Sequence, residues 1–270
     1  MSGSAAAGTR DLAAAAQALL VAHHADRPLV LPNAWDPASA RAVEAAGFFV
    51  ATSSNAIAAV IGERDDDSSQ PDVIFGWLGR IARGVSVPLT ADVQAGYGLP
   101  AAELVDRLLD AGAVGCNLED TDHHGGPGPL LDADHQAAYL REVRAAADAR
   151  GVHVVINARV DSFVRKVGDD SAQLAEALRR GRLYFDAGAD CVYPIMAADP
   201  AAIRRLADEM PGPINVNARR GGLTVEQLTD LGVRRISFAS GLHQLAMAHL
   251  EADLGRLAGG SSLADLWPSV

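Results

Sequence analysis

The feature that most constrains this chain is an alternation of short apolar runs with longer stretches of helical periodicity. The runs have the length and composition of buried parallel strands. The expected strands are 29–33, 48–53, 87–92, 113–119, 152–159, 190–195, 213–217 and 235–239, and the expected helices are 36–46, 72–83, 100–110, 134–150, 171–187, 199–209, 224–230 and 240–256. Eight such units in 270 residues predict an α/β fold of the (β/α)8 TIM-barrel type, for which about 250 residues is usual.

A weak internal repeat supports the barrel. Several expected helices end with Gly shortly before the next strand, where Gly adopts the left-handed conformation that terminates helices. These glycines stand at positions 47, 112, 188 and 232. An open doubly wound sheet is the alternative architecture, but no Gly-x-Gly-x-x-Gly follows the first expected strand.

The chain contains no Pro/Gly/Ser-rich linker that would divide it. Residues 1–270 are therefore predicted to form a single domain. Within it, residues 1–10 are expected to be disordered, and 240–270 to form a C-terminal helix and tail.

Composition excludes several classes of protein. The formal net charge of −11 opposes nucleic acid and anionic membrane surfaces as partners. One lysine, Lys166, is present, and Val167 follows it, so a phosphate-binding Gly-Lys-Ser/Thr loop is excluded and a Schiff-base enzyme would depend on that lysine alone. Two cysteines, no apolar run of about 18 residues and no signal-peptide pattern predict a cytoplasmic protein.

Polar residues follow most of the expected strands, and in a barrel the active site lies at these carboxyl ends. The polar strand ends are Asn33-Ala-Trp-Asp36, Thr52-Ser-Ser-Asn55, Asp92-Val-Gln94, Asn117-Leu-Glu-Asp120, Asn157-Ala-Arg-Val-Asp161 and Asn215-Val-Asn217. Asp92 and Glu119 are expected on adjacent strands at the same depth, with Asp120 beside them. With no His on these strands, the carboxylates favour Mg²⁺ bound with several waters, and Mn²⁺ is the alternative ion.

Arg159 stands on the strand after that of Glu119 and is placed to bind a substrate carboxylate in bidentate fashion. Together with the carboxylates, it predicts a site for a di-anionic 2-oxo or 2-hydroxy acid chelated to Mg²⁺. The metal would stabilise an enolate as a bond to the neighbouring carbon breaks.

Structural roles compete with these interpretations. Asp92 alone is equally well explained as a helix cap or turn former. Asp161 either caps the segment after its strand or pairs with Arg159, and Ser53 and Ser54 either cap a helix or bind a carboxylate. The functional interpretation is favoured by the joint pattern.

Three motifs on successive strands resemble those of the isocitrate lyase/phosphoenolpyruvate mutase superfamily. They are Ala91-Asp-Val-Gln-Ala-Gly-Tyr-Gly98, Asn117-Leu-Glu-Asp120 and Asn157-Ala-Arg-Val-Asp161, supported by Asn33-Ala-Trp-Asp36 and Gly62-Glu-Arg-Asp65. The resemblance covers roughly residues 29–250. It implies a Mg²⁺-dependent barrel enzyme that makes or breaks C–C or P–C bonds next to a 2-oxo acid or its enolate. It also implies Asp92 as a direct metal ligand and Glu119 as a ligand through water.

The same resemblance implies which residues contact the substrate. Arg159 and the backbone around Ser53, Ser54 and Asn55 would bind the carboxylate. Trp35, Asp65 and Asn217 complete the set: Asp65 matches an acidic residue beside the reacting group in the mutase branch, and Asn217 a substrate-binding Asn of the lyase branch. Members are usually tetramers that exchange a C-terminal helix between subunits, so a homotetramer or homodimer with an exchanged helix over 240–256 is expected.

Departures from the family pattern are informative. Gln94 stands where the family usually has a second Asp, which makes the metal site less negative. The Cys-containing loop of the lyase branch is replaced by Thr121-Asp-His-His-Gly-Gly-Pro-Gly-Pro129, so isocitrate and methylisocitrate cleavage by the usual mechanism is not expected.

His123 or His124 could supply the lost proton transfer, and His124 is taken as the catalytic candidate; a solvated loop histidine is the alternative. Ile195 ends the sixth strand, where lyases have Glu and the mutase His.

The sequence therefore predicts a Mg²⁺-dependent lyase or decarboxylase, of a phosphonomutase-like branch, that cleaves a C–C bond in a small 2-oxo or 2-hydroxy dicarboxylate. P–C chemistry (a phosphonopyruvate mutase or hydrolase) is the nearest alternative; Asp65 favours it, and the missing strand-six His disfavours it. A non-catalytic barrel that binds a 2-oxo acid and a metal aldolase of another barrel family are further alternatives.

Overall fold

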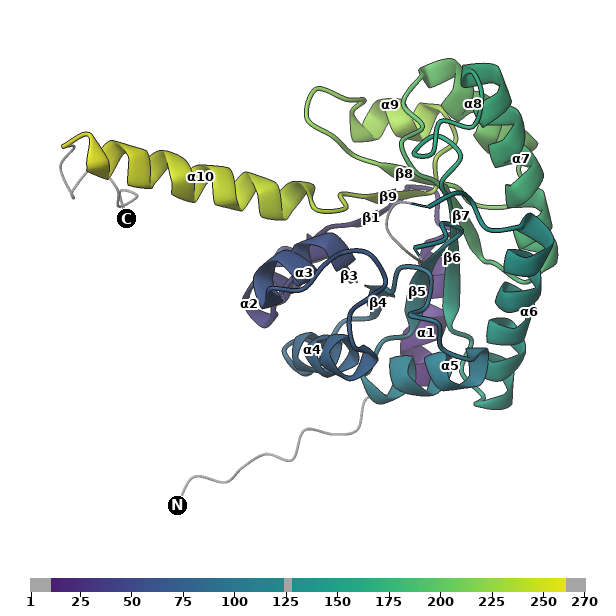
Figure 1. Cartoon of the computed structure of the whole chain (residues 1–270), viewed down its shortest axis with the longest axis horizontal. Coiled ribbons are helices and arrows are strands. Elements are labelled where there is room, and N and C mark those ends of the chain that lie inside the picture. The colour runs from purple at the N-terminus through teal and green to yellow at the C-terminus, as the bar shows by residue number, and fades with distance from the viewer. Residues whose placement is uncertain (1–10, 124–127, 261–270) are drawn as a thin grey trace.

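The computed structural model describes residues 11–123 and 128–260 of the chain (Figure 1). The strands are β1 (Leu29–Leu31), β2 (Asn33–Ala34), β3 (Val50–Thr52), β4 (Leu89–Asp92), β5 (Gly115–Glu119), β6 (Val155–Val160), β7 (Cys191–Pro194), β8 (Asn215–Asn217) and β9 (Arg235–Ser237). The helices are α1 (Leu12–Ala22), α2 (Pro37–Ala45), α3 (Ser54–Ile61), α4 (Pro71–Arg83), α5 (Ala101–Asp110), α6 (Ala133–Ala149), α7 (Asp170–Asp186), α8 (Pro200–Glu209), α9 (Val225–Asp230) and α10 (Gly241–Ala258). The expected disorder of residues 1–10 and the tail after residue 260 lie outside the described residues.

The strands pair in parallel and close into a barrel. One sheet has the order β2-β3-β4-β5-β6-β7 and the other β1-β9-β8. β1 and β2 are two parts of one extended segment, so residues 29–34 join the two sheets on one side. On the other side, a parallel bridge between Val192 and Ile214 links β7 to β8. The strands among the described residues thus fill eight places around one barrel, which confirms the predicted (β/α)8 fold.

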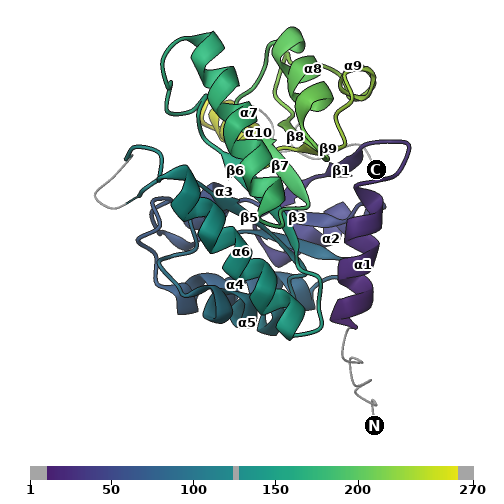
Figure 2. The same cartoon turned by 90° about the vertical axis from the view of Figure 1, so that its right-hand side faces the viewer.

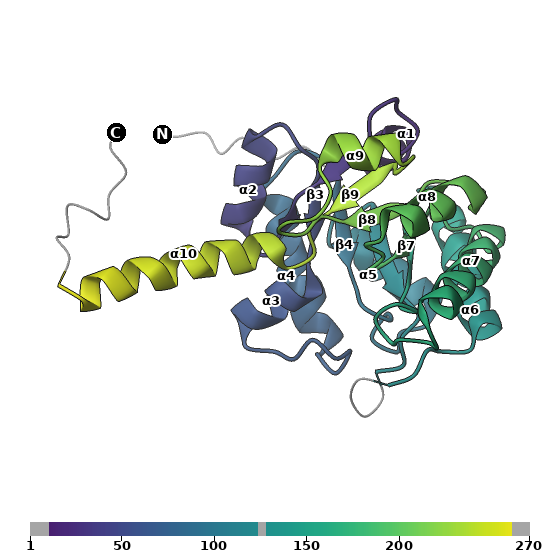
Figure 3. The ribbon, with the colours of Figure 1, turned by 90° about the horizontal axis from the view of Figure 1, so that it is seen from above.

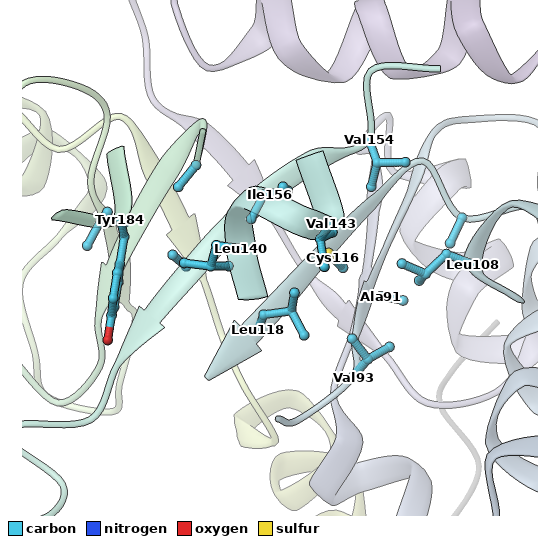
Figure 4. Packing of buried hydrophobic residues seen from close by; sticks show 14 of the residues in the cluster. Ala91, Val93, Leu108, Cys116, Leu118, Leu140, Val143, Val154, Ile156 and Tyr184 are labelled. Atoms are coloured by element: carbon cyan, nitrogen blue, oxygen red, sulfur yellow. The ribbon is translucent and has the colours of Figure 1, made fainter. Parts of the chain in front are cut away.

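Buried apolar side chains pack between the strands of the barrel and the helices that surround it. Figure 4 shows Leu118 of β5 and Ile156 of β6 among the buried residues, together with Leu140 and Val143 of α6. All four are fully buried. Burial of each such side chain contributes about 1.5–3 kcal/mol to folding. The strands that carry the polar ends therefore stand on a well-packed layer.

Two helices were not expected from the sequence. α1 precedes the first strand and lies at the end of the barrel where β5 and β6 begin, with Ala16 and Leu19 packed on Val114 and Val155 (Figure 2). A β-carbon on Gly115 would approach a methyl of Leu19 to 2.9 Å, so Gly at that position permits the close packing. α3 follows β3 directly, and Ser53, which was expected either to cap a helix or to bind a carboxylate, is its N-cap.

The C-terminal helix α10 projects away from the barrel (Figures 1 and 3). None of its residues is buried, and Leu245, Met247, Leu250 and Leu254 are between 40% and 59% exposed. The helix was predicted over 240–256, and its exchange between subunits remains a prediction. Within the described ranges, no helix combines the length and hydropathy needed to cross a bilayer.

Candidate active site

The polar strand ends meet at the carboxyl end of the barrel, but Asp92 and Glu119 are not opposite each other on β4 and β5. Asp92 of β4 pairs with Asn117, whereas Glu119 of β5 pairs with Arg159 of β6. Glu119 instead lies level with Gln94, whose carbonyl accepts its backbone N–H at 2.9 Å. The expectation of equal depth for Asp92 and Glu119 is therefore wrong by two residues, because strands that tilt in a barrel are displaced along one another.

Asp92 has one satisfied and one unsatisfied carboxylate oxygen. Its Oδ2 accepts hydrogen bonds from the backbone N–H and the hydroxyl of Ser54, both at 3.0 Å. Its Oδ1 is out of contact with solvent and has no hydrogen-bond partner among the described residues. Burial and the nearby charge of Glu119 raise the pKa of Asp92 to about 6. A buried carboxylate oxygen without a partner is costly, and a bound cation removes that cost.

Glu119 is 3% exposed and is held by an arginine and a histidine. Its Oε2 forms an ion pair with Nη1 of Arg159, and its Oε1 a hydrogen bond with Nε2 of His123. Burial alone would lower the pKa of His123, but the hydrogen bond and charge of Glu119 raise it overall above its ordinary value. His123 is thus the loop histidine that the structure brings into the site. His124 lies outside the described residues.

Arg159 is oriented by a carboxylate of its own strand end. Its Nε and Nη2 donate to the two oxygens of Asp161, at 2.6 and 2.9 Å. This confirms the alternative in which Asp161 pairs with Arg159. Burial alone would lower the pKa of Arg159, but Glu119 and Asp161 raise it well above its ordinary range. Both Nη atoms carry a second N–H, so the guanidinium keeps donors for a ligand.

Asp120 holds Asp161, the partner of Arg159, in place through hydrogen bonds. Its Oδ1 accepts the backbone N–H of Asp161 at 2.9 Å, while its Oδ2 accepts from Arg180 at 3.0 Å and Tyr184 at 2.8 Å. Asp120 is fully buried, and burial, together with the charge of Asp161, raises its pKa to about 6. It therefore ties α7 to the end of β6, and the expectation that it joins Asp92 and Glu119 is wrong.

Asp65 reaches the site from the segment between α3 and α4. Its Oδ1 accepts from Nε2 of Gln94 at 2.7 Å. Its charge also contributes to raising the pKa of Asp92. Gln94 in turn accepts the backbone N–H of Asp67, so the amide that replaces a carboxylate holds this segment at two points.

The other predicted substrate-binding residues fall in different places. Ser53 caps α3, with its Oγ accepting the N–H of Ala56 at 3.3 Å, and Ser54 binds Asp92. Asn55 is exposed on α3. Trp35 packs edge-on to His243 of α10, with ring centres 5.1 Å apart, and lines an apolar cavity of about 510 Å³ between α2 and α10.

Asn217 ends β8 beside a polar hollow. It lines a cavity of about 280 Å³ together with Arg219 and Arg220. Its Oδ1 is buried with no hydrogen-bond partner in the part of the chain that the structure describes. Arg219 is anchored through Nη2 to the carbonyls of Met196 and Ala197, at 3.0 and 3.1 Å.

The carboxylates at the strand ends suit a hard cation such as Mg²⁺. Among residues 11–123 and 128–260, no three His, Cys, Asp or Glu side chains gather closely enough to enclose an ion. Mg²⁺ does not need such a cage, because it commonly takes one or two carboxylates and completes its shell with water and substrate oxygens. The unpartnered Oδ1 of Asp92, with Glu119 nearby, fits that mode of binding.

Sequence reasoning missed the roles of Gln94 and Asp120 and the contact of Ser54 with Asp92. Part of the signal was available, since Gly96 and Gly98 follow Gln94 closely and mark a tight turn, at the start of which Gln94 itself has a φ of +51°. A non-glycine residue in that conformation is uncommon and is often functional.

The closed parallel barrel, with acidic and basic side chains gathered at the carboxyl ends of its strands, is that of a TIM-barrel enzyme. Residues 19–258 match the family model described as phosphoenolpyruvate phosphomutase. The chain belongs to this family, and through it to the isocitrate lyase/phosphoenolpyruvate mutase superfamily of lyases and mutases.

Three similar proteins illustrate the relationship. A candidate phosphonomutase from Burkholderia cenocepacia J2315 has a crystal structure that superposes with a TM-score of 0.84 at 37% identity, over 89% of this chain and 98% of that one. An uncharacterized protein of Mycobacterium tuberculosis strain H37Rv is 32% identical over 84% of this chain and 85% of its own length. Probable 2-methylisocitrate lyase 2 of Corynebacterium glutamicum is 30% identical over 84% of this chain and 76% of its own length.

Proposed function

We propose that the chain is a Mg²⁺-dependent lyase or decarboxylase that cleaves a C–C bond in a small 2-oxo or 2-hydroxy dicarboxylate; Mn²⁺ would serve in place of Mg²⁺. The observation that carries this proposal is the unpartnered, buried Oδ1 of Asp92 close to the permanently charged Arg159. One group is suited to a metal and the other to a carboxylate, and together they suit an acid that chelates the metal. Similarity to a probable 2-methylisocitrate lyase supports C–C chemistry.

Each side chain has a definite task in this proposal. Asp92 directly, and Glu119 through water, would hold the metal, and Arg159 would bind the substrate carboxylate with the N–H groups that Asp161 and Glu119 leave available. A bound Mg²⁺ would stabilise the negative charge that develops on the substrate oxygens as the bond breaks. Candidates for proton transfer are His123, which Glu119 orients, and His124.

The remaining candidates complete the substrate site. Asp65 would stand beside the reacting group, and Asn217 would accept a hydrogen bond from the substrate through its buried Oδ1. The backbone of α3 around Ser53, Ser54 and Asn55 would lie next to the carboxylate. Trp35 would border the site from the side of α10.

P–C bond chemistry is the second candidate function. The contribution of Asp65 to the charge around Asp92 favours it, as does the similarity to a candidate phosphonomutase. The apolar Ile195, which directly follows β7, disfavours it, because a charged phosphono group gains nothing from an aliphatic neighbour.

The test is ¹H and ³¹P NMR of the protein with Mg²⁺ and a panel of acids, with Asp92→Ala as the control. The panel holds oxaloacetate, phosphonopyruvate, phosphoenolpyruvate, 2-methylisocitrate and dimethylmalate. Release of pyruvate or another 2-oxo acid that requires Mg²⁺ and Asp92 supports the proposal, and the ³¹P spectrum separates P–C from C–C cleavage. Saturable binding of a 2-oxo acid without turnover would favour a non-catalytic barrel.

We also propose that the enzyme is a homotetramer or homodimer of the cytoplasm. The exposed apolar side chains of α10 and the apolar cavity beside Trp35 support an interface between copies of the chain. The two buried free thiols, Cys116 and Cys191, suit a reducing compartment. Neither nucleic acid nor a membrane surface is proposed as a partner, because the net charge is −11.

A further inference from the structure

The segment between α3 and α4 carries Asp65 but is itself largely exposed. Residues 62–65 and Ser68 are exposed, while Ser69 is buried. A segment of this kind has little apolar packing to hold it, so its position depends on specific hydrogen bonds. Two of these hydrogen bonds come from Gln94 of the barrel, which is 3% exposed.

Gln94 uses both ends of its amide. Its Nε2 donates to Oδ1 of Asp65 at 2.7 Å, and its Oε1 accepts the backbone N–H of Asp67. A second tie runs in parallel, from the N–H of Tyr97 to Oδ1 of Asp67 at 2.9 Å. The turn that contains Gln94 is itself fixed to β5, because its carbonyl accepts the N–H of Glu119 at 2.9 Å.

An amide meets this double requirement in a way that a carboxylate does not. An ionised Glu or Asp offers acceptors alone. Glu at position 94 could still accept from Asp67, but its second oxygen would face the carboxylate of Asp65 at hydrogen-bond distance. Two like charges so close repel each other strongly. Gln94 therefore holds Asp65 with a donor that adds no negative charge of its own.

We propose that Gln94 is a positioning residue: its amide fixes the segment 62–70 against the turn after β4 and so holds Asp65 near Asp92. The fixing of the segment is independent of the reaction. The consequence for turnover rests on the proposed function, in which Asp65 stands beside the reacting group.

Cleavage by trypsin after Arg64 can report local opening of the segment, because the Arg64 side chain is 81% exposed and trypsin cleaves after Arg. Cleavage there gives fragments 1–64 and 65–270, which mass spectrometry identifies among other products. Proteolysis of a folded protein follows the population of the locally opened segment. Because Asp65 follows the cleaved bond and is changed in two of the variants, each initial rate is divided by the rate for the same variant unfolded in urea. This ratio measures how firmly the segment is held.

The decisive set of variants exchanges amide and carboxylate. Gln94→Glu should raise the rate of cleavage after Arg64 about tenfold, as expected for loss of a charge-assisted hydrogen bond and gain of a like charge. Asp65→Asn alone should stay near the wild-type rate, because its amide oxygen still accepts from Gln94. Gln94→Glu combined with Asp65→Asn should return close to the wild-type rate, since the amide introduced by Asp65→Asn then donates to the new carboxylate.

The matched control is Gln173→Glu. Gln173 is a buried glutamine, 9% exposed, that donates to the carbonyl of Gly168 at 3.1 Å, far along the chain from Arg64. This variant should lower the melting temperature and leave cleavage after Arg64 unchanged. The proposal is overturned if Gln94→Glu is cleaved there at the wild-type rate, or if the double variant is cleaved as fast as Gln94→Glu.

Turnover on the acid panel separates this inference from the proposed function. If both hold, the double variant recovers wild-type resistance to trypsin but not activity, because it lacks the Asp65 carboxylate. If wild type turns over none of the acids, the proposed function fails, while the trypsin rates still decide the role of Gln94.

Discussion

Asp161 binds Arg159 through two hydrogen bonds, from Nε at 2.6 Å and from Nη2 at 2.9 Å, at the carboxyl end of β6. The guanidinium is thereby oriented before any ligand arrives, and Asp161 is itself fixed by its backbone bond to Asp120. A charged group that needs no rearrangement stabilises developing charge more effectively than a mobile one.

This arrangement predicts that Arg159→Lys loses most activity, with kcat/KM falling about 100-fold or more. An ammonium is a point charge and cannot serve both oxygens of Asp161, Glu119 and a ligand at once. Steady-state kinetics on a substrate found in the acid panel make the measurement. Arg179→Lys is the matched control and should be silent, because the Arg179 side chain is exposed and pairs with Glu176 on the same helix. Near-normal kcat/KM for Arg159→Lys would refute the role of the guanidinium.

Ser54→Ala should weaken Mg²⁺ binding roughly tenfold without unfolding the protein. The variant removes the hydroxyl bond to Oδ2 of Asp92 but keeps the backbone bond, so the carboxylate is less well oriented. Isothermal titration with Mg²⁺ gives the affinity. Ser53→Ala is the control: it removes the cap of α3 and should cost about 1 kcal/mol of stability, with Mg²⁺ affinity retained. Equal affinities for all three proteins would contradict the prediction.

The raised pKa of Asp92 predicts opposite pH trends with and without metal. The folded state binds the proton with a pKa of about 6, against the ordinary 3.8, so the contribution of Asp92 to metal-free stability is largest below about pH 4 and is lost as the pH rises towards 6. Mg²⁺ requires the ionised carboxylate. Its stabilising effect on the melting temperature should therefore be small at pH 5 and full near pH 7. In Asp92→Asn, the Mg²⁺ effect should be small at every pH; an undiminished effect in that variant would place the metal elsewhere.

The exposed face of α10 predicts that wild type elutes as a dimer or tetramer in light-scattering chromatography. Leu250→Asp should lower the mass towards that of the 28.1 kDa chain, because a charge at an apolar contact is costly to bury. Glu251→Gln, on the same exposed helix, should leave the mass unchanged. A monomeric wild type would show that α10 stands free.

Residues whose role is local were predictable from the sequence. The apolar runs predicted strands close to those observed, the pairing of Arg159 with Asp161 was one of two alternatives, and the capping role of Ser53 was another. Each depends on neighbours within a few positions along the chain, where geometry is set by the strand or helix itself.

Contacts across the barrel were not predictable in the same way. The displacement of Glu119 past Asp92 depends on how far the strands tilt, which a single sequence does not encode at any one position. The role of Gln94 depends on a segment 27 positions earlier in the chain, which reaches it through the backbone of Asp67. α1 was overlooked because it precedes the first strand and so falls outside the repeating unit.

The single bridge that links β7 to β8 affects where the barrel opens locally. Between β5 and β6, five residue pairs are in register, whereas β7 and β8 are joined by the pair Val192 and Ile214. On the other side, Pro32 separates β1 from β2 and has no N–H to contribute to a ladder. The amides beside these two junctions should take up deuterium sooner than those of β5, so the barrel opens first as an arc of six strands and an arc of three.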